Sequence, residues 1–295
     1  MPTAVDELLT VAAQVTTTFD AVPAEPVAVT GPLEMTSEDT REVVDRYGRH
    51  GFAIIEIRSG NSDPAAVQAL GKALGLGEPF VPPLYTLGGQ DVRSVSRISA
   101  AANAGSSDEH HPSFGRTVGQ PFHCDGTLQT IGFIKSAVLL CESPAAEGGE
   151  TILFNASAAF AELAALDPAA AAALGTHGVL TRQANINGCT DENVGPAFTV
   201  QDGRLVCGYS VTATDRWTYP DASDAAALDR GVAFLDRASR PDSPLYLRLR
   251  LDTGHAILLD NTRISHGRLP YVDSAERRRC MYRGLFRQSP VHLPQ

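Results

Sequence analysis

The chain has 295 residues, 43% of them hydrophobic and 20% charged, which is typical of a soluble globular protein with one large domain or two small ones. Its 24 basic and 34 acidic residues give a net charge of −10, which argues against nucleic acid or an anionic membrane as the main partner, because both need a basic face. The five scattered cysteines lack a CxxC motif and favour a reduced, cytoplasmic setting, and no apolar run reaches the roughly 18 residues of a membrane span.

The N-terminal part of the chain carries clear helix signals. Thr36 is a good helix cap and Gly51 a good stop, so a helix is predicted between them. Residues 78–120 are rich in Gly, Pro and Ser, and long loops of this kind are often functional. The elements predicted in this part are helices at 1–20, 36–51 and 63–77, strands at 52–57 and 91–99, and a proline-rich connector at 21–32.

Short strands dominate from residue 121 onward. They are predicted at 121–125, 136–143, 150–156, 178–183, 198–209, 245–261 and 279–287. Two helices interrupt them, at 157–175 and 223–239, and the "QDG" at 201–203 is a hairpin turn signal. A helical N-terminal part followed by many short strands predicts an α+β protein built on a β-barrel or jelly roll.

The stretch "PFHCDGTLQ" places His123 and Asp125 two positions apart. In a strand such positions face the same side, so both can bind one metal ion, and His266 is the best candidate for a third ligand. Two histidines and one carboxylate form a facial triad, the usual site of non-haem Fe(II) that activates oxygen. Taken singly, an HxD pair is more often a surface turn, and His255 stays open as a core histidine or a competing ligand.

Two further motifs accompany this trio. The glycines of "EGGET" (147–151) let the backbone approach closely, and Thr151 adds a hydroxyl, although the motif can also be a simple turn. Arg279 and Arg283 are spaced to share one face of a strand, where an arginine fork can grip a carboxylate. The alternative for arginines in an acidic protein is surface ion pairing.

The motifs "HCDG", "GGET", "DNTRISHGR" and "RRCMYR", in this order over residues 121–287, resemble the Fe(II)/2-oxoglutarate dioxygenases of the taurine dioxygenase and γ-butyrobetaine hydroxylase type. The resemblance implies a double-stranded β-helix, or jelly-roll, core with flanking helices. It implies one dioxygenase domain over 1–295, with a helical and strand N-terminal part at 1–120 and the jelly-roll core with the metal site at 121–295.

The resemblance also assigns roles to single residues. His123, Asp125 and His266 match the iron ligands, which are also the catalytic centre. Thr151 and Arg279 match the residues that bind the carboxylates of 2-oxoglutarate. Arg283 matches a position that holds an anionic group of the substrate in several relatives.

The implied enzyme uses Fe(II), 2-oxoglutarate and O₂, with ascorbate as an auxiliary reductant. It hydroxylates an unactivated C–H of a small anionic or amino-acid-like substrate and releases succinate and CO₂. Asp125 stands where halogenating relatives have a small residue, which favours hydroxylation over halogenation. Desaturation, cyclisation and epimerisation stay open, because the triad does not choose among them.

Further substrate contacts are expected from loops at the barrel mouth, around residues 106–116 and 182–195. The candidates are Arg97, His111, Arg116 and Trp217. Two other classes remain as alternatives: a non-catalytic barrel that binds metal or 2-oxoglutarate, and a zinc hydrolase with the same triad. A hydrolase has no need of a 2-oxoglutarate clamp, so Arg279 and Thr151 argue against it. The expected partner is a small molecule, with neither nucleic acid nor membrane, and homo-oligomer formation is left open.

Overall fold

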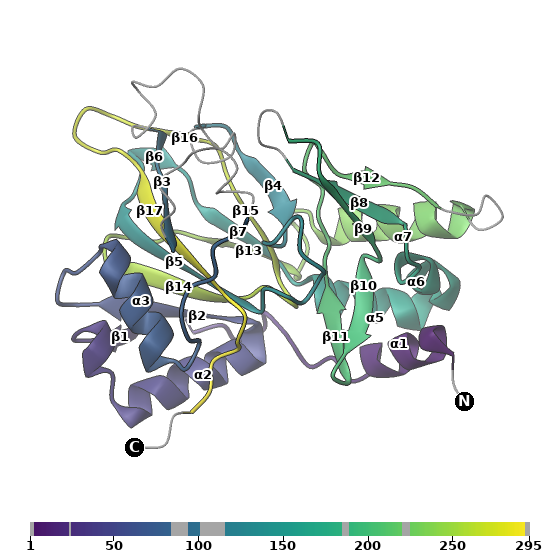
Figure 1. Cartoon of the computed structure of the whole chain (residues 1–295), viewed down its shortest axis with the longest axis horizontal. Coiled ribbons are helices and arrows are strands. Elements are labelled where there is room, and N and C mark those ends of the chain that lie inside the picture. The colour runs from purple at the N-terminus through teal and green to yellow at the C-terminus, as the bar shows by residue number, and fades with distance from the viewer. Residues whose placement is uncertain are drawn as a thin grey trace.

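The chain folds around two β-sheets, seen in a computed structural model that describes residues 3–23, 25–83, 94–100, 116–184, 189–219 and 225–292 (Figure 1). The strands of the larger sheet are β1 (Val27–Val29), β2 (Phe52–Ile57), β3 (Val95–Ile98), β5 (Ser136–Ser143), β14 (His255–Asp260) and β17 (Cys280–Phe286). Within the described residues they lie in the order β1-β2-β14-β5-β17-β3. Only β1 and β2 pair in parallel; the other neighbours in this sheet are antiparallel.

The second sheet carries the region around the HxD motif. Its strands are β4 (Gln120–His123), β7 (Thr151–Phe154), β13 (Tyr246–Leu249) and β15 (Ser265–Arg268), in the order β13-β7-β15-β4. Smaller sheets pair β6 (Glu147–Gly148) with β16 (Tyr271–Val272), β10 (Phe198–Gln201) with β11 (Arg204–Cys207), and β8 (Leu180–Gln183) with β9 (Glu192–Gly195) and β12 (Arg216–Trp217).

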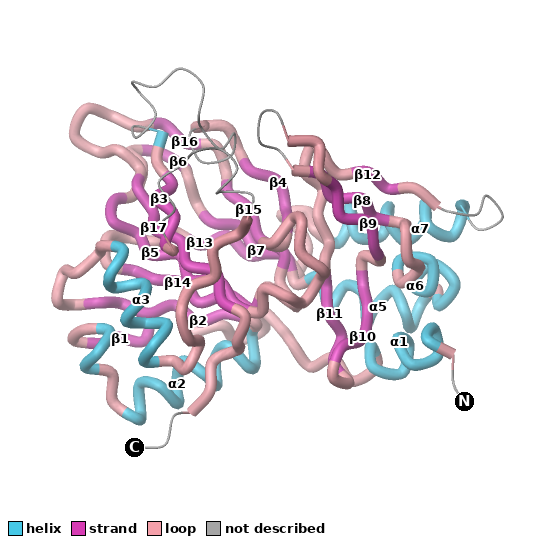
Figure 2. The backbone as a smooth tube through the Cα atoms, in the orientation of Figure 1, coloured by secondary structure: helices cyan, strands magenta, loops and turns pink. Residues whose placement is uncertain are grey.

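Helices cover one face of the six-stranded sheet and gather around β10 and β11 beside the four-stranded sheet (Figure 2). On the side of the six-stranded sheet lie η1 (Pro32–Glu34), α2 (Ser37–His50) and α3 (Pro64–Ala73). On the side of the four-stranded sheet lie α1 (Ala4–Ala12), α5 (Ala156–Leu166), α6 (Pro168–Leu174) and α7 (Ala225–Ala238). None of the helices in the described ranges is long and apolar enough to cross a membrane.

Three clusters of buried apolar side chains join these layers. One packs α2 and α3 against the six-stranded sheet. Another, here called the outer cluster, joins α1, α5, α6 and α7 to β10, β11 and the outward side chains of β4 and β7. The third fills the space between the sheets, with Leu139 and Met281 from one and Leu153 from the other. Phe122 of β4 belongs to the outer cluster, so strand alternation turns the next residue, His123, toward the space between the sheets.

Several elements differ from the sequence predictions. The first helix covers only Ala4–Ala12, and the predicted connector contains β1, whose Val27 pairs with Ile55 of β2. The predicted helix at 157–175 is two helices, because Pro168 starts a new one and disfavours helical backbone at Asp167, which caps it. The segment 245–261 is likewise two strands, β13 and β14, and residues 91–93 of the predicted strand 91–99 lie outside the described ranges.

Other predictions are confirmed. The "QDG" turn joins β10 to β11, with positive φ at Asp202 (52°) and Gly203 (68°), as a two-residue hairpin requires. The helix after Thr36 has the predicted cap and ends at Gly51 in the left-handed conformation. The mixture of helices and many short strands confirms the α+β class.

Candidate metal and cofactor site

His123, Asp125 and His266 meet in the space between the sheets. His266 of β15 is the register partner of His123 at the end of β4, and their ring centroids lie 4.5 Å apart. His266 Nε2 is 3.5 Å from Asp125 Oδ2, and the ligand atoms of all three residues lie within 4.8 Å of one another. Antiparallel pairing of β4 with β15 thus brings together side chains that are far apart in the sequence, and this trio can hold one metal ion.

Asp125 lies outside the strand that was predicted to contain it. β4 ends at His123, and the chain bends through Asp125 to Gly126, which has φ +90°. The Asp125 N–H donates to the side-chain oxygen of Asn261 at 2.7 Å rather than to a strand neighbour. The predicted strand 121–125 is therefore shorter at this end, since side-chain hydrogen bonding replaces the sheet ladder there.

The two histidines can each turn a ring nitrogen toward a metal. Burial lowers the pKa of His266 to about 3; His123 and Arg283 act in the same direction, and Asp125 opposes them. His123 Nδ1 lies 3.0 Å from the carbonyl of Pro121, which only accepts, so Nδ1 is the donor in this contact and Nε2 is left to face a metal. The pKa of His266 keeps its ring neutral, as a metal ligand requires.

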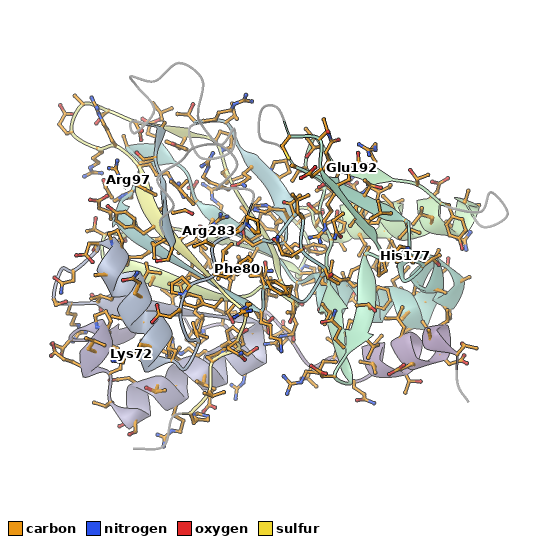
Figure 3. All side chains as sticks on the ribbon, viewed as in Figure 1. Lys72, Phe80, Arg97, His177, Glu192 and Arg283 are labelled. Atoms are coloured by element: carbon orange, nitrogen blue, oxygen red, sulfur yellow. The ribbon has the colours of Figure 1, made fainter. Side chains whose placement is uncertain are left out.

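Arg283 reaches this trio from the opposite sheet. It lies on β17, where Figure 3 labels it, and is 6% exposed. Its NH1 is 2.5 Å from Asp125 Oδ1. Arg283 was predicted to contact an anionic group of the substrate. Its contact with Asp125 was not predicted, because the two residues are 158 positions apart in the sequence. One oxygen of the carboxylate thus meets Arg283 while the other faces His266.

Thr151 and Arg279 line one small pocket, together with Cys141, Gly149 and Met281 among others. Arg279 is 5% exposed, and no salt bridge to its guanidinium occurs within the described residues. Burial, followed by the charge of Arg268, lowers the pKa of Arg279 to about 10, so it stays protonated at neutral pH. A buried cation beside a hydroxyl suits a carboxylate ligand.

The "GG" turn lets the backbone approach this arginine. Gly148 and Gly149 have φ of +70° and +74°, and a Cβ on Gly149 would lie 3.2 Å from Arg279 Cδ and Nε. Arg279 itself precedes β17, and the ladder shifts register between Cys280 and Met281. Even so, Arg279 and Arg283 both face the space between the sheets, as their even spacing predicts.

Arg97 and Arg116, two of the other predicted substrate contacts, lie away from this trio. Arg97 of β3 is 3.9 Å from Glu142, on the face of the six-stranded sheet that carries Cys280 and Tyr282, and Figure 3 shows it nearer the periphery than Arg283. Arg116 is exposed, and its carbonyl accepts from Arg268 NH2 at 2.8 Å.

Trp217, His111 and His255 are the remaining residues that the sequence suggested for the site. Trp217 packs on the outer cluster, its ring centroid 6.0 Å from that of Tyr209. His111 lies outside the described residues. His255 begins β14 opposite Glu56 and is not part of the metal-binding trio, so the structure does not support it as a competing ligand.

Two histidines and one carboxylate within reach of one metal ion are the ligand set of non-haem Fe(II) oxygenases. The family model described as taurine catabolism dioxygenase TauD, TfdA family matches residues 13–285. The chain therefore belongs to this family and is a 2-oxoglutarate- and Fe(II)-dependent dioxygenase.

Similar single proteins agree with this family assignment. A protein named uridine-5'-phosphate dioxygenase from Amycolatopsis sp is 38% identical over 262 residues, which cover 88% of this chain and 93% of that protein. A taurine dioxygenase structure from Burkholderia xenovorans has a TM-score of 0.59 at 15% identity, covering 87% of this chain and 84% of the other. An asparagine oxygenase structure, in complex with Fe(II), 2S,3S-3-hydroxyasparagine and succinate, has a TM-score of 0.57 at 13% identity and covers 96% and 90%.

Proposed function

We propose that this dioxygenase oxidises a C–H bond of uridine 5′-phosphate or a closely related nucleoside phosphate, with release of succinate and CO₂. The name of the 38% identical relative supports this substrate. It also fits the small anionic substrate expected from the sequence. Hydroxylation of the carbon is the proposed outcome, and desaturation, cyclisation or epimerisation are the alternatives at the same site.

In this proposal His123, Asp125 and His266 hold Fe(II), and their donor set supports it. Two neutral imidazole nitrogens and one carboxylate are the ligands that non-haem Fe(II) oxygenases use. Fe(II) with 2-oxoglutarate and O₂ supplies the oxidising power when bound. The chain shields part of the site from water, since Asp125 and His266 are 8% and 5% exposed, whereas His123 is half-buried.

Thr151 and Arg279 are proposed to bind the carboxylate of 2-oxoglutarate that lies away from the metal. The pocket that they share and the lack of a carboxylate partner for Arg279 within the described residues support this role. Arg283 is proposed to hold Asp125 in place. Its contact with a substrate anion stays a prediction, as do those of Arg97, His111, Arg116 and Trp217.

The architecture supports two further proposals. The two sheets, with the third apolar cluster between them, are proposed to close into a double-stranded β-helix. All three apolar clusters share strands of these sheets, so we also propose a single domain over residues 1–295, with 1–120 as its N-terminal part and 121–295 as the core. A small-molecule partner without nucleic acid, and a cytoplasmic location, remain predictions from charge and cysteine content.

Succinate release tests the substrate. Purified protein supplied with Fe(II), 2-oxoglutarate and O₂ is incubated with uridine 5′-phosphate, uridine or taurine, and succinate is measured against a reaction without substrate. We expect stimulation by uridine 5′-phosphate above that by uridine, and none in Asp125→Ala. Stimulation by taurine but not by uridine 5′-phosphate would contradict the proposed substrate while leaving the enzyme class intact.

A further inference from the structure

Asn261 lies in the connection between β14 and β15 and is 3% exposed. Its side-chain oxygen accepts from the Asp125 N–H at 2.7 Å. Its amide nitrogen donates to the Asp125 carbonyl at 3.1 Å and to the Ile134 carbonyl at 2.9 Å. One side chain thus holds both backbone groups of Asp125, and links them to the segment that leads into β5.

These hydrogen bonds lie outside the regular secondary structure, where no strand pairing satisfies the backbone of Asp125. β4 ends at His123, and Asp125 is 8% exposed, so its backbone groups are removed from water as well as from the sheet ladder. Buried backbone groups need hydrogen-bond partners, and Asn261 supplies them. Asn261 therefore fixes the backbone of Asp125, and Arg283 contacts its carboxylate. Together they set the direction in which the Asp125 side chain points.

The connection that carries Asn261 is itself held firmly. Asp260 Oδ1 accepts from the Thr262 N–H at 3.0 Å and from its hydroxyl at 2.6 Å, and Asp260 Oδ2 is 2.5 Å from Arg263 Nε. His266 follows in β15, five residues after Asn261. The connection between β14 and β15 thus leads directly to His266 and, through Asn261, fixes the backbone of Asp125.

We infer that Asn261 is a positioning residue for metal binding, which presets the Asp125 carboxylate before the metal arrives. The inference rests on the proposed role of Asp125 as a ligand. A preset ligand loses less conformational freedom on binding, so removing Asn261 weakens metal binding beyond its effect on folding.

Asn155 provides a matched control. It is also a fully buried amide, it accepts from the Ala158 N–H at 3.2 Å, and it donates to the Thr17 carbonyl at 3.1 Å. It caps α5 and is not part of the trio. Loss of its side chain removes backbone hydrogen bonds of the same kind without touching the metal-binding residues.

The experiment measures the dissociation constant of Fe(II) anaerobically against a competing chelator, together with the melting temperature of the metal-free protein. The variants are Asn261→Ala, Asn155→Ala, Asp125→Ala and Asn261→Leu, which keeps the approximate size of Asn261 and adds no charge but loses all three side-chain hydrogen bonds. We expect both Asn261 variants to bind Fe(II) about 10- to 100-fold more weakly than the wild type. We expect Asn155→Ala to lower the melting temperature while its Fe(II) affinity stays at the wild-type value.

Each contrary result has a distinct meaning. Wild-type Fe(II) affinity in both Asn261 variants, or an equal loss in Asn155→Ala, would overturn the inference and leave Asn261 as a structural residue. Wild-type affinity in Asp125→Ala would instead overturn the ligand assignment on which the proposed function rests.

Discussion

At the scale of single residues, Arg279 is the group that most specifically requires an acidic ligand. It is buried and charged, and within the described residues it has no salt bridge. Leaving such a cation without an anion is unfavourable, whereas a bound carboxylate stabilises it. The same pocket presents the Thr151 hydroxyl.

Arg279→Ala should therefore raise the KM for 2-oxoglutarate. Truncating one partner of a buried charged pair costs about 2–5 kcal/mol, which corresponds to about 30-fold or more in KM. Fe(II) affinity should change little, because Arg279 does not contact the trio. Steady-state kinetics and an anaerobic Fe(II) titration measure the two quantities.

The neighbouring Arg278 is exposed, and Arg278→Ala is the matched control that should leave the KM unchanged. An unchanged KM in Arg279→Ala would show that a different arginine, Arg278 or Arg283, binds the 2-oxoglutarate carboxylate.

Residues of the site could be predicted from the sequence where they lie only a few positions apart. His123 and Asp125 are two positions apart, and Arg279 and Arg283 are four apart, so each pair could be expected to share a site. The strands themselves hold only His123 and Arg283, because β4 ends at His123 and β17 begins at Cys280. Asn261 could not be found in this way. Its partner Asp125 is 136 positions away, and an Asp-Asn pair in a turn is common for reasons of turn chemistry alone.

At the scale of elements, the turn that joins β6 to β7 shapes the pocket that Thr151 and Arg279 line. Gly149 has φ +74°, and its backbone lies against both Tyr271 and Arg279. A side chain at this position would strain the backbone and press on the arginine.

Gly149→Ala should destabilise the protein by about 1–2 kcal/mol, because an L residue is disfavoured in the left-handed conformation. It should also raise the KM for 2-oxoglutarate, since the new methyl group would displace Arg279. Denaturant unfolding and kinetics measure the two effects.

Gly60→Ala is the control that distinguishes backbone strain from a side-chain contact with Arg279. Gly60 has a similar φ of +75°, but a Cβ there would meet nothing within 4 Å. Gly60→Ala should thus show the loss of stability without the change in KM, and equal KM changes in both variants would refute the proposed contact.

Elements were predictable where start and stop signals are local, as in α2 between Thr36 and Gly51. β1 was not, since three residues in a proline-rich segment become a strand only through parallel pairing with β2. The end of β4 at His123 was also missed, because a long-range side-chain bond to Asp125 decides it.

At the scale of the whole molecule, two sheets that face each other place the trio and the arginines in one space. His123 and His266 come from the four-stranded sheet, while Arg283 comes from the six-stranded sheet and Arg279 directly precedes its strand β17. The sequence predicts the class of fold from its many short strands. It does not predict the sheet order, in which β14 lies between β2 and β5, because pairing between distant strands leaves no local pattern.

The most direct test of this arrangement is an anaerobic titration of the metal-free protein with Fe(II) and then 2-oxoglutarate, followed by visible absorption. We expect a weak metal-to-ligand charge-transfer band that requires both additions and is absent in His266→Ala. A folded wild-type protein without this band, or a band that persists in His266→Ala, would contradict the assignment of His123, Asp125 and His266 as the metal centre.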